Sequence, residues 1–291
     1  MTAPAGRPVI TGVDGGASGR DALVLGRWAA ETLRAPLVVA VVHPAPSAIG
    51  SGRVDAEWIA DRHRAAEAVL DGAREELRGF EAAQYRMVGS SSAAHGLHDL
   101  AEELNGQVIV VGSGRAAPKH RLFAGSTADR LLAGSEWPIA VAPAQMEVPP
   151  GAVGRIGVAY VDTPDGRAAL DEAARLARLT GSPLRLYTVV AEGAGTLPFL
   201  VGDDAEHAFL ETARETYETA LEKAVEHVRD VDADWRLLSG DVVESLAELQ
   251  EVDVLFCGSR GYGPARRVLL GGVSTRLMRR ARRPIVVVPR S

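Results

Sequence analysis

Cysteine is almost absent from this chain, which has Cys257 as its one cysteine in 291 residues. A single cysteine excludes an intrachain disulfide and fits a reducing compartment. Long apolar runs are also lacking: Leu37–Val42 is only strand length, whereas a bilayer span needs roughly 20 residues. The N-terminus has neither the basic start nor the apolar segment of a signal peptide. We therefore expect a soluble cytoplasmic protein that makes no use of a membrane.

Aromatic residues and positive charge are scarce as well. Aromatics make up 5% of the sequence, so aliphatic side chains must fill the core, as buried parallel strands require. The formal net charge is −6, whereas a protein that coats nucleic acid needs a positive surface, so nucleic acid is not an expected partner. At roughly 150 residues per domain, the length predicts two domains.

An internal repeat confirms this division at the level of the sequence. Ala35–Leu37 returns as Ser182–Leu184 at an offset of 147, and Val111–Ser113 returns as Cys257–Ser259 at an offset of 146. Unrelated matches would scatter in offset, so the chain is a tandem duplication. The segment Pro143–Gly154 holds three prolines and two glycines and predicts the boundary. The predicted domains are residues 1–146 and 147–291.

Within each half, short apolar runs alternate with helical patterns. The predicted strands are Pro8–Val13, Leu37–Val42, Glu81–Met87, Val108–Val111 and Ile139–Ala142, then Arg155–Val161, Leu184–Val190, Ala233–Leu238, Val254–Cys257 and Ile285–Val288. The predicted helices are Ser18–Arg34, Asp55–Phe80, Ser92–Leu104 and Ser126–Leu132, then Asp165–Thr180, Asp203–Arg229, Val242–Leu249 and Val273–Arg280. The predicted helix-capping residues are Asp55, Asp165, Asp203 and Asp241. Such alternation predicts right-handed crossovers into a mostly parallel, doubly wound α/β sheet in each half.

Glycine-rich turns follow the fourth predicted strand of each half. In the second half the turn contains Gly258 and Gly261 and, nine residues later, Gly271, Gly272, Val273 and Ser274 at a helix start. The first half has the same spacing, with Gly112, Arg115, Gly125, Ser126 and Thr127 at the corresponding positions. Glycines let a backbone approach a ligand closely, and free N–H groups at a helix start favour an anion. Glycines also make tight turns without any ligand, and both interpretations stay open.

These turns resemble the phosphate loop of the universal stress protein family. The start Val9–Gly15 and the end Pro284–Pro289 are similar to that family too, so the resemblance covers essentially the whole chain. It implies five-stranded, Rossmann-like doubly wound domains that in many members bind an adenine nucleotide, ATP, with Mg. It also implies a regulatory stress-response protein rather than an enzyme.

The resemblance assigns a role to particular positions in each half. Asp14 and the backbone of Val41 would hold the adenosine end in the first half, and Thr188 falls at the second-strand position of the second half. The glycine turns would hold ribose and phosphates: Gly112, Gly125, Ser126 and Thr127 in the first half, and Gly258, Gly261, Gly271, Gly272, Val273 and Ser274 in the second. Both halves depart from the pattern, since Arg115 replaces a glycine, Val161 replaces the aspartate and Gly272 replaces a Ser or Thr.

No residue pattern in the chain identifies a reaction. Cys257 has no histidine placed to activate it, and His95 and His98 lack a third metal ligand at a recognisable spacing. An ATP-pyrophosphate-cleaving ligase would need a Ser-Gly-Gly-x-Asp-Ser loop, which Asp14–Ser18 does not supply. The main alternative to nucleotide binding is an interaction module with degenerate sites.

Assembly is predicted from the last strand of each half. Ile139–Ala142 and Ile285–Val288 are apolar and lie at predicted sheet edges, and the resemblance implies dimerisation through this strand. We expect the two halves to pair this way as an internal pseudo-dimer, and further homodimerisation stays open. The long helical stretches Asp55–Phe80 and Asp203–Arg229 are the expected partner-facing parts.

Overall fold

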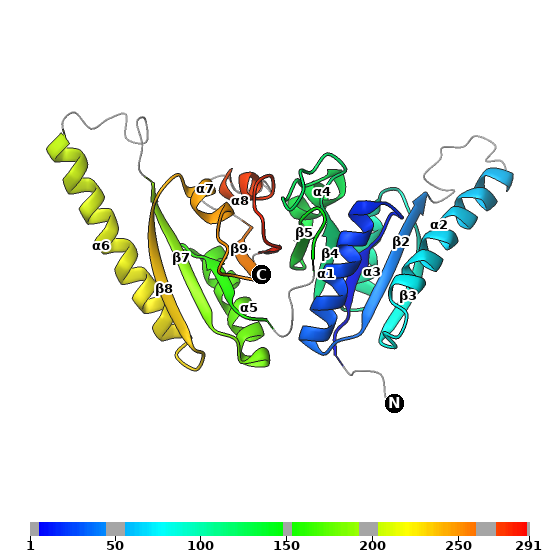
Figure 1. Ribbon diagram of the computed structural model, residues 1–291, viewed down its shortest axis with the longest axis horizontal. Helices are drawn as coiled ribbons and strands as arrows, with labels where there is room; N and C mark the ends of the chain where they lie inside the picture. The colour runs from blue at the N-terminus through cyan, green and yellow to red at the C-terminus, as the bar shows by residue number, and fades with distance from the viewer. Residues whose placement is uncertain (1–5, 45–55, 148–152, 192–202, 260–271, 290–291) are drawn as a thin grey trace. The chain divides into compact units, whose positions relative to one another are not determined.

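The computed structural model describes residues 6–44, 56–147, 153–191, 203–259 and 272–289 (Figure 1). The chain divides into two compact units, residues 1–150 and 151–291. In each unit, strands alternate with helices along the whole length. The predicted α/β class is therefore confirmed.

The described residues of the first unit form five strands and four helices. Its strands are β1 (Val9–Gly12), β2 (Leu37–Pro44), β3 (Ala83–Ser90), β4 (Val108–Gly112) and β5 (Ile139–Ala142). Its helices are α1 (Ala17–Leu33), α2 (Ala56–Glu76), α3 (Ala93–Glu103) and α4 (Ser126–Gly134). The strands are all parallel and lie in the order β3-β2-β1-β4-β5.

The second unit repeats this arrangement. Its strands are β6 (Ile156–Ala159), β7 (Leu184–Ala191), β8 (Ala233–Gly240), β9 (Val254–Gly258) and β10 (Ile285–Val288). Its helices are α5 (Pro164–Thr180), α6 (Asp203–His227), α7 (Val242–Ala247) and α8 (Gly272–Leu277). The strands are again parallel, in the order β8-β7-β6-β9-β10. The pairing of the two halves through their last strands stays a prediction.

Helices cover both faces of the first unit's sheet, which explains its all-apolar central strands. In β1, a Cβ on Gly12 would meet Leu97 of α3, whereas Thr11 lies against Gly26 of α1. Because neighbouring strand residues point to opposite faces, α1 and α3 lie on opposite sides of the sheet. The central strands are accordingly buried along their length, and the edge strands β3 and β8 are exposed at alternate positions.

The helix starts differ in part from the predicted caps. Asp241 caps α7 as expected, accepting from the N–H groups of Val243 and Glu244 at 2.8 and 2.9 Å. For α5 the prediction of Asp165 is wrong, because Thr163 is the cap and Pro164 follows it in the first helical position. Proline suits that position because an N–H group there would have no acceptor within the helix, so its loss costs nothing. Asp55 lies outside the described residues, and Asp203 is the first residue of α6.

Among the helices of the described ranges, none combines the length and the apolar character that a membrane span requires.

Candidate functional site

A pocket of about 350 Å³ opens at the carboxyl ends of β1, β2 and β4 in the first unit. The chain proceeds from β1 outward in one direction and from β4 outward in the other. In open parallel sheets this switch point is where ligands bind, because the two adjoining loops diverge there. Asp14, Val41, Gly112 and Thr127 all line the pocket. The sequence-based site residues of the first half are thus largely brought together.

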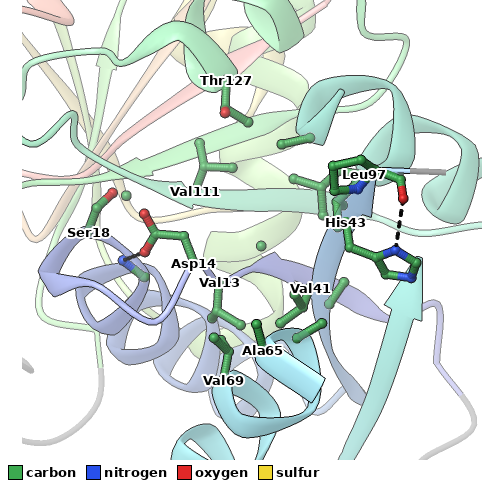
Figure 2. A pocket seen from close by; sticks show the side chains of 18 of the residues that line it. Val13, Asp14, Ser18, Val41, His43, Ala65, Val69, Leu97, Val111 and Thr127 are labelled. Atoms are coloured by element: carbon green, nitrogen blue, oxygen red, sulfur yellow. Dashed lines mark hydrogen bonds between the residues drawn. The ribbon is translucent and has the colours of Figure 1, made fainter. Parts of the chain in front are cut away.

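The carboxylate of Asp14 lies at one side of this pocket, near Ser18 and below Thr127 (Figure 2). Its Oδ1 accepts hydrogen bonds from the backbone N–H groups of Gly16 and Gly19, at 2.9 and 3.2 Å. Gly16 is the N-cap of α1 and offers no side chain, so Asp14 caps the helix from two residues earlier. These bonds fix the orientation of the carboxylate through its Oδ1. The second oxygen, Oδ2, takes no part in capping the helix.

Gly112 is required by a close approach of two backbones. A Cβ at this position would lie 1.9 Å from the carbonyl oxygen of Ser18. The end of β4 therefore packs directly against the first turn of α1. In the second unit a Cβ on Gly258 would likewise lie 2.7 Å from the carbonyl oxygen of Asp165. The close packing of the backbone therefore requires glycine at both positions, whether or not a ligand binds.

The N-terminus of α4 supplies the donors of the site. Gly125 is its N-cap and makes no side-chain cap hydrogen bond. The helical ladder begins with the N–H of Asp129 bonded to the Gly125 carbonyl at 2.9 Å, so the preceding first-turn N–H groups have no acceptor within the helix. Thr127 in this turn lines the pocket, whereas Ser126 is exposed. Free N–H groups and the positive end of the helix dipole favour an anion here.

The remaining walls are mostly apolar and come from β2, α2, α3 and the residue after β1. Val13, Val41, Ala65, Val69 and Leu97 surround the interior (Figure 2). Ala65 and Val69 are one helical turn apart on α2 and so share a face. Such walls suit a flat, uncharged ring.

Two basic side chains lie at the far side of this pocket. His43 and Arg62 both line it. The His43 ring lies edge-on to His63 with centroids 6.0 Å apart, and its Nδ1 is 3.2 Å from the Pro44 carbonyl oxygen. The Arg62 guanidinium pairs with Asp61 at 2.7 Å. Neither residue was expected from the sequence.

The strand register assigns the pocket-facing backbone to Val42 rather than to Val41. The N–H of Leu37 donates to the carbonyl of Ala82, the residue before β3. The Ala40 carbonyl accepts from the N–H of Val13, the residue after β1. Because N–H and C=O of one residue point to the same side and alternate along a strand, odd residues of β2 face β3. Val42 is thus the first residue whose backbone extends past the end of β1, one position beyond the predicted one.

The second unit has a pocket of about 520 Å³ at the corresponding place. Its lining includes four predicted residues, namely Thr188, Gly258, Val273 and Ser274. Gly261 and Gly271 lie outside the described residues, and Gly272 is the exposed first residue of α8.

The polar groups of the second pocket bond within the protein. The Thr188 hydroxyl donates to the Tyr160 carbonyl at 2.7 Å, and the Ser274 hydroxyl donates to the Gly258 carbonyl at 3.1 Å. The Tyr160 hydroxyl donates to Asp162 at 3.2 Å, and burial raises its pKa to about 12. Val161 stands where the first unit has Asp14. The described part of this pocket therefore presents a neutral, largely apolar surface.

A different residue caps the helix in the second unit. The Thr163 hydroxyl accepts from the N–H of Gly166 at 3.1 Å, as Asp14 does for Gly19. Gly19 and Gly166 are equivalent at the offset of 147. Val161 thus replaces an aspartate without leaving the helix uncapped.

The catalytic and metal candidates of the sequence are placed as follows. Cys257 is buried, and burial raises the pKa of its thiol to about 12. The Nδ1 of His95 lies 3.0 Å from the Ser92 hydroxyl, which caps α3, and the His98 ring packs edge-on against Trp137 at 5.0 Å. Within the described ranges, no three His, Cys, Asp or Glu residues gather as a metal site.

Two repeated, doubly wound α/β units with a pocket at each switch point define a tandem Rossmann-like protein. The sequence profile of the universal stress protein family matches residues 6–143 and again residues 153–289. The chain belongs to this family.

Relatives match the chain over its full length. The universal stress protein Rv2319c of Mycobacterium tuberculosis is 30% identical over 293 residues, covering 97% of this chain and 99% of that protein, and Mb2346c of Mycobacterium bovis matches equally. A universal stress protein from Archaeoglobus fulgidus superposes with a TM-score of 0.67 at 20% identity, covering 98% of this chain and 96% of that one. A functionally unknown protein from Pseudomonas aeruginosa PAO1 gives 0.66 at 14% identity, covering 99% and 94%. The solved structures share the tandem fold.

Proposed function

We propose that this protein binds an adenine nucleotide, ATP, in the pocket of its first unit and acts through that binding rather than through a reaction. The observation that carries the proposal is the combination at one switch point of a fixed carboxylate, apolar walls and an uncapped helix N-terminus. The resemblance of the turns to the family's phosphate loop supports the same ligand.

Each part of the pocket suits one part of the nucleotide. Val13, Val41 and Val69 offer apolar surface to the base, and the backbone of Val42 offers a donor and an acceptor to its edge. Asp14 can accept hydrogen bonds from the ribose hydroxyls. The first turn of α4, including Thr127, suits the phosphates. The volume of about 350 Å³ falls within the range of small-molecule sites.

Magnesium would enter this site with the phosphates. Asp14 is the single carboxylate among the described residues that line the pocket. Mg²⁺ is commonly bound through one or two carboxylates, substrate phosphates and water. The lining residues therefore fit Mg²⁺ as part of the nucleotide complex.

For the second unit we propose no nucleotide. Val161 removes the carboxylate, and the hydroxyls of Thr188 and Ser274 already donate to backbone carbonyls. Among the described residues that line this pocket, a buried ribose or phosphate would lack a charged partner, which is costly. A stabilising or partner-binding role for this unit fits its neutral pocket better.

Calorimetric titration of the intact chain with Mg-ATP tests the proposal. We expect one site per chain, with the affinity falling about 10-fold in Asp14→Asn, since a charged hydrogen bond contributes about 1.5 kcal/mol or more. Asparagine keeps a side-chain oxygen for the Gly16 and Gly19 N–H groups. Thr163→Ala removes the equivalent cap from the second unit and serves as the control. Absence of binding, or equal loss in the control, would contradict the proposal.

A further inference from the structure

Arg115 occupies the position at which the family pattern and the second half have a glycine. The N–H of Ala117 donates to the Gly114 carbonyl at 2.9 Å, so Arg115 is the first central residue of a β-turn. Arg115 is not among the described residues with positive φ. A side chain therefore fits at this position without backbone strain.

The base of this turn is anchored to the core. The N–H of Gly114 donates to the Phe123 carbonyl at 2.6 Å, and the Ser113 hydroxyl donates to the Ala142 carbonyl at 2.8 Å. Leu122, on the returning part of the loop, is fully buried. The Arg115 side chain thus extends from a fixed backbone.

The turn that carries Arg115 lies beside the N-terminus of α4, where phosphates are proposed. The residue before Arg115, Gly114, packs on Gly125, the N-cap of α4, where a Cβ would lie 3.1 Å from the opposing Cα. From there the guanidinium reaches Asp14, with Nη2 3.9 Å from Oδ2. The guanidinium therefore lies near the carboxylate, on a turn that packs against the start of α4.

The ion pair between Arg115 and Asp14 is loose. The side chain of Arg115 is 90% exposed and that of Asp14 is 47% exposed. Exposed pairs at such distances contribute little, because water screens them and long side chains lose freedom. An incoming polyphosphate, with more charge than one carboxylate and a geometry that suits a guanidinium fork, competes well for Arg115.

We infer that Arg115 is a phosphate-reading residue, which exchanges Asp14 for the phosphate chain of the bound nucleotide and makes the pocket prefer polyphosphorylated ligands. The inference rests on the proposed nucleotide site and adds its selectivity. The exchange also releases Oδ2 of Asp14 toward the ribose. The first half thus has an exposed arginine, Arg115, where the phosphate loop of the family has a glycine.

The test compares affinities for adenosine, AMP and ATP in the intact protein. Arg115→Ala should weaken ATP binding about 10-fold, the order expected for one charge-assisted contact, and leave adenosine binding within about twofold. Arg115→Lys should recover part of the loss, because lysine keeps the charge but not the fork. Lys119→Ala changes the same charge at an exposed position of the same loop and should leave the ATP-to-adenosine ratio unchanged.

The outcomes separate this inference from the proposed function. If the wild-type protein binds neither adenosine nor ATP, the nucleotide site itself fails. If ATP binds but Arg115→Ala leaves its affinity unchanged or improves it, the site stands and Arg115 is a bystander or an obstruction. An equal loss in Lys119→Ala would assign the effect to net charge alone. Thermal melting of each variant shows whether the fold is kept.

Discussion

Asp14 Oδ1 lies 3.2 Å from the backbone nitrogen of Gly19 and accepts its hydrogen bond across the start of α1. The equivalent glycine of the second unit, Gly166, donates instead to Thr163 at 3.1 Å. Both capping residues line the pocket of their own unit, but one offers a carboxylate and the other a neutral hydroxyl. The two units thus cap equivalent helices with side chains of different charge.

This relationship predicts matched stability losses with unmatched binding losses. Asp14→Ala and Thr163→Ala should each lower the unfolding free energy of their own unit by about 1 kcal/mol, the usual effect of losing a cap. Only Asp14→Ala should weaken ATP binding. Urea denaturation and calorimetry of both variants measure the two effects. Equal binding losses would show that Asp14 has no contact with the ligand.

Gly112→Ala should be strongly destabilising. The new Cβ would lie 1.9 Å from the Ser18 carbonyl oxygen, and two backbones must separate to admit it. We expect a loss of about 3 kcal/mol or more in the unfolding free energy, at the high end for single substitutions.

The control for that prediction is Gly72→Ala in α2, where a Cβ would meet nothing within 4 Å. Alanine is favoured over glycine inside a helix by roughly 0.5–1 kcal/mol, so this variant should be more stable than wild type. Chemical denaturation compares the two. Similar effects of both substitutions would show that the close approach to the Ser18 carbonyl does not explain the glycine at position 112.

Asp241 should contribute stability that depends on pH. Hydrogen bonds from the backbone N–H groups of Glu244 and Val243 lower its pKa below the ordinary value of 3.8. A depressed acid pKa means that the stabilisation is complete above the unfolded pKa and is lost as pH falls through the folded one. Asp241→Ala should therefore cost about 1 kcal/mol at pH 7. The difference should shrink below about pH 3, and a difference independent of pH would contradict this.

Cys257 should be inert toward thiol reagents in the folded protein. Burial raises its pKa to about 12, and only the thiolate reacts readily. At pH 8, labelling should proceed at the rate of unfolding or opening rather than at that of a free thiol. Comparison with the urea-unfolded chain gives the protection. Rapid labelling of the native protein would show that the second pocket admits reagents to the sulfur.

The sequence predicts the repeated fold well because the decisive signals are local. Apolar runs such as Ile285–Val288 indicate strands buried on both faces, and glycine spacing locates the turns. The cap of α5 was misassigned because Thr163 and Asp165 both suit a helix start, and only the backbone distinguishes them.

The candidate site is predicted less completely, for a physical reason. Val42 rather than Val41 presents its backbone to the pocket, and this follows from inter-strand register, which a single strand does not encode. The wall formed by Ala65 and Val69 depends on how α2 crosses the sheet. In the sequence, small apolar residues one helical turn apart, such as Ala65 and Val69, indicate an apolar helix face. Any helix that packs on a sheet has such a face, so the pattern does not identify a pocket wall.

Hydrogen–deuterium exchange of the intact protein with and without Mg-ATP tests the central claim most directly, because it reports on both units at once. The account predicts slower exchange in the segments Gly12–Gly19 and Gly112–Ala128 of the first unit, where the carboxylate and the start of α4 surround the pocket. It predicts unchanged exchange in Ala159–Gly166 of the second. Protection confined to the second unit, or no protection in either, would contradict a nucleotide site built around Asp14.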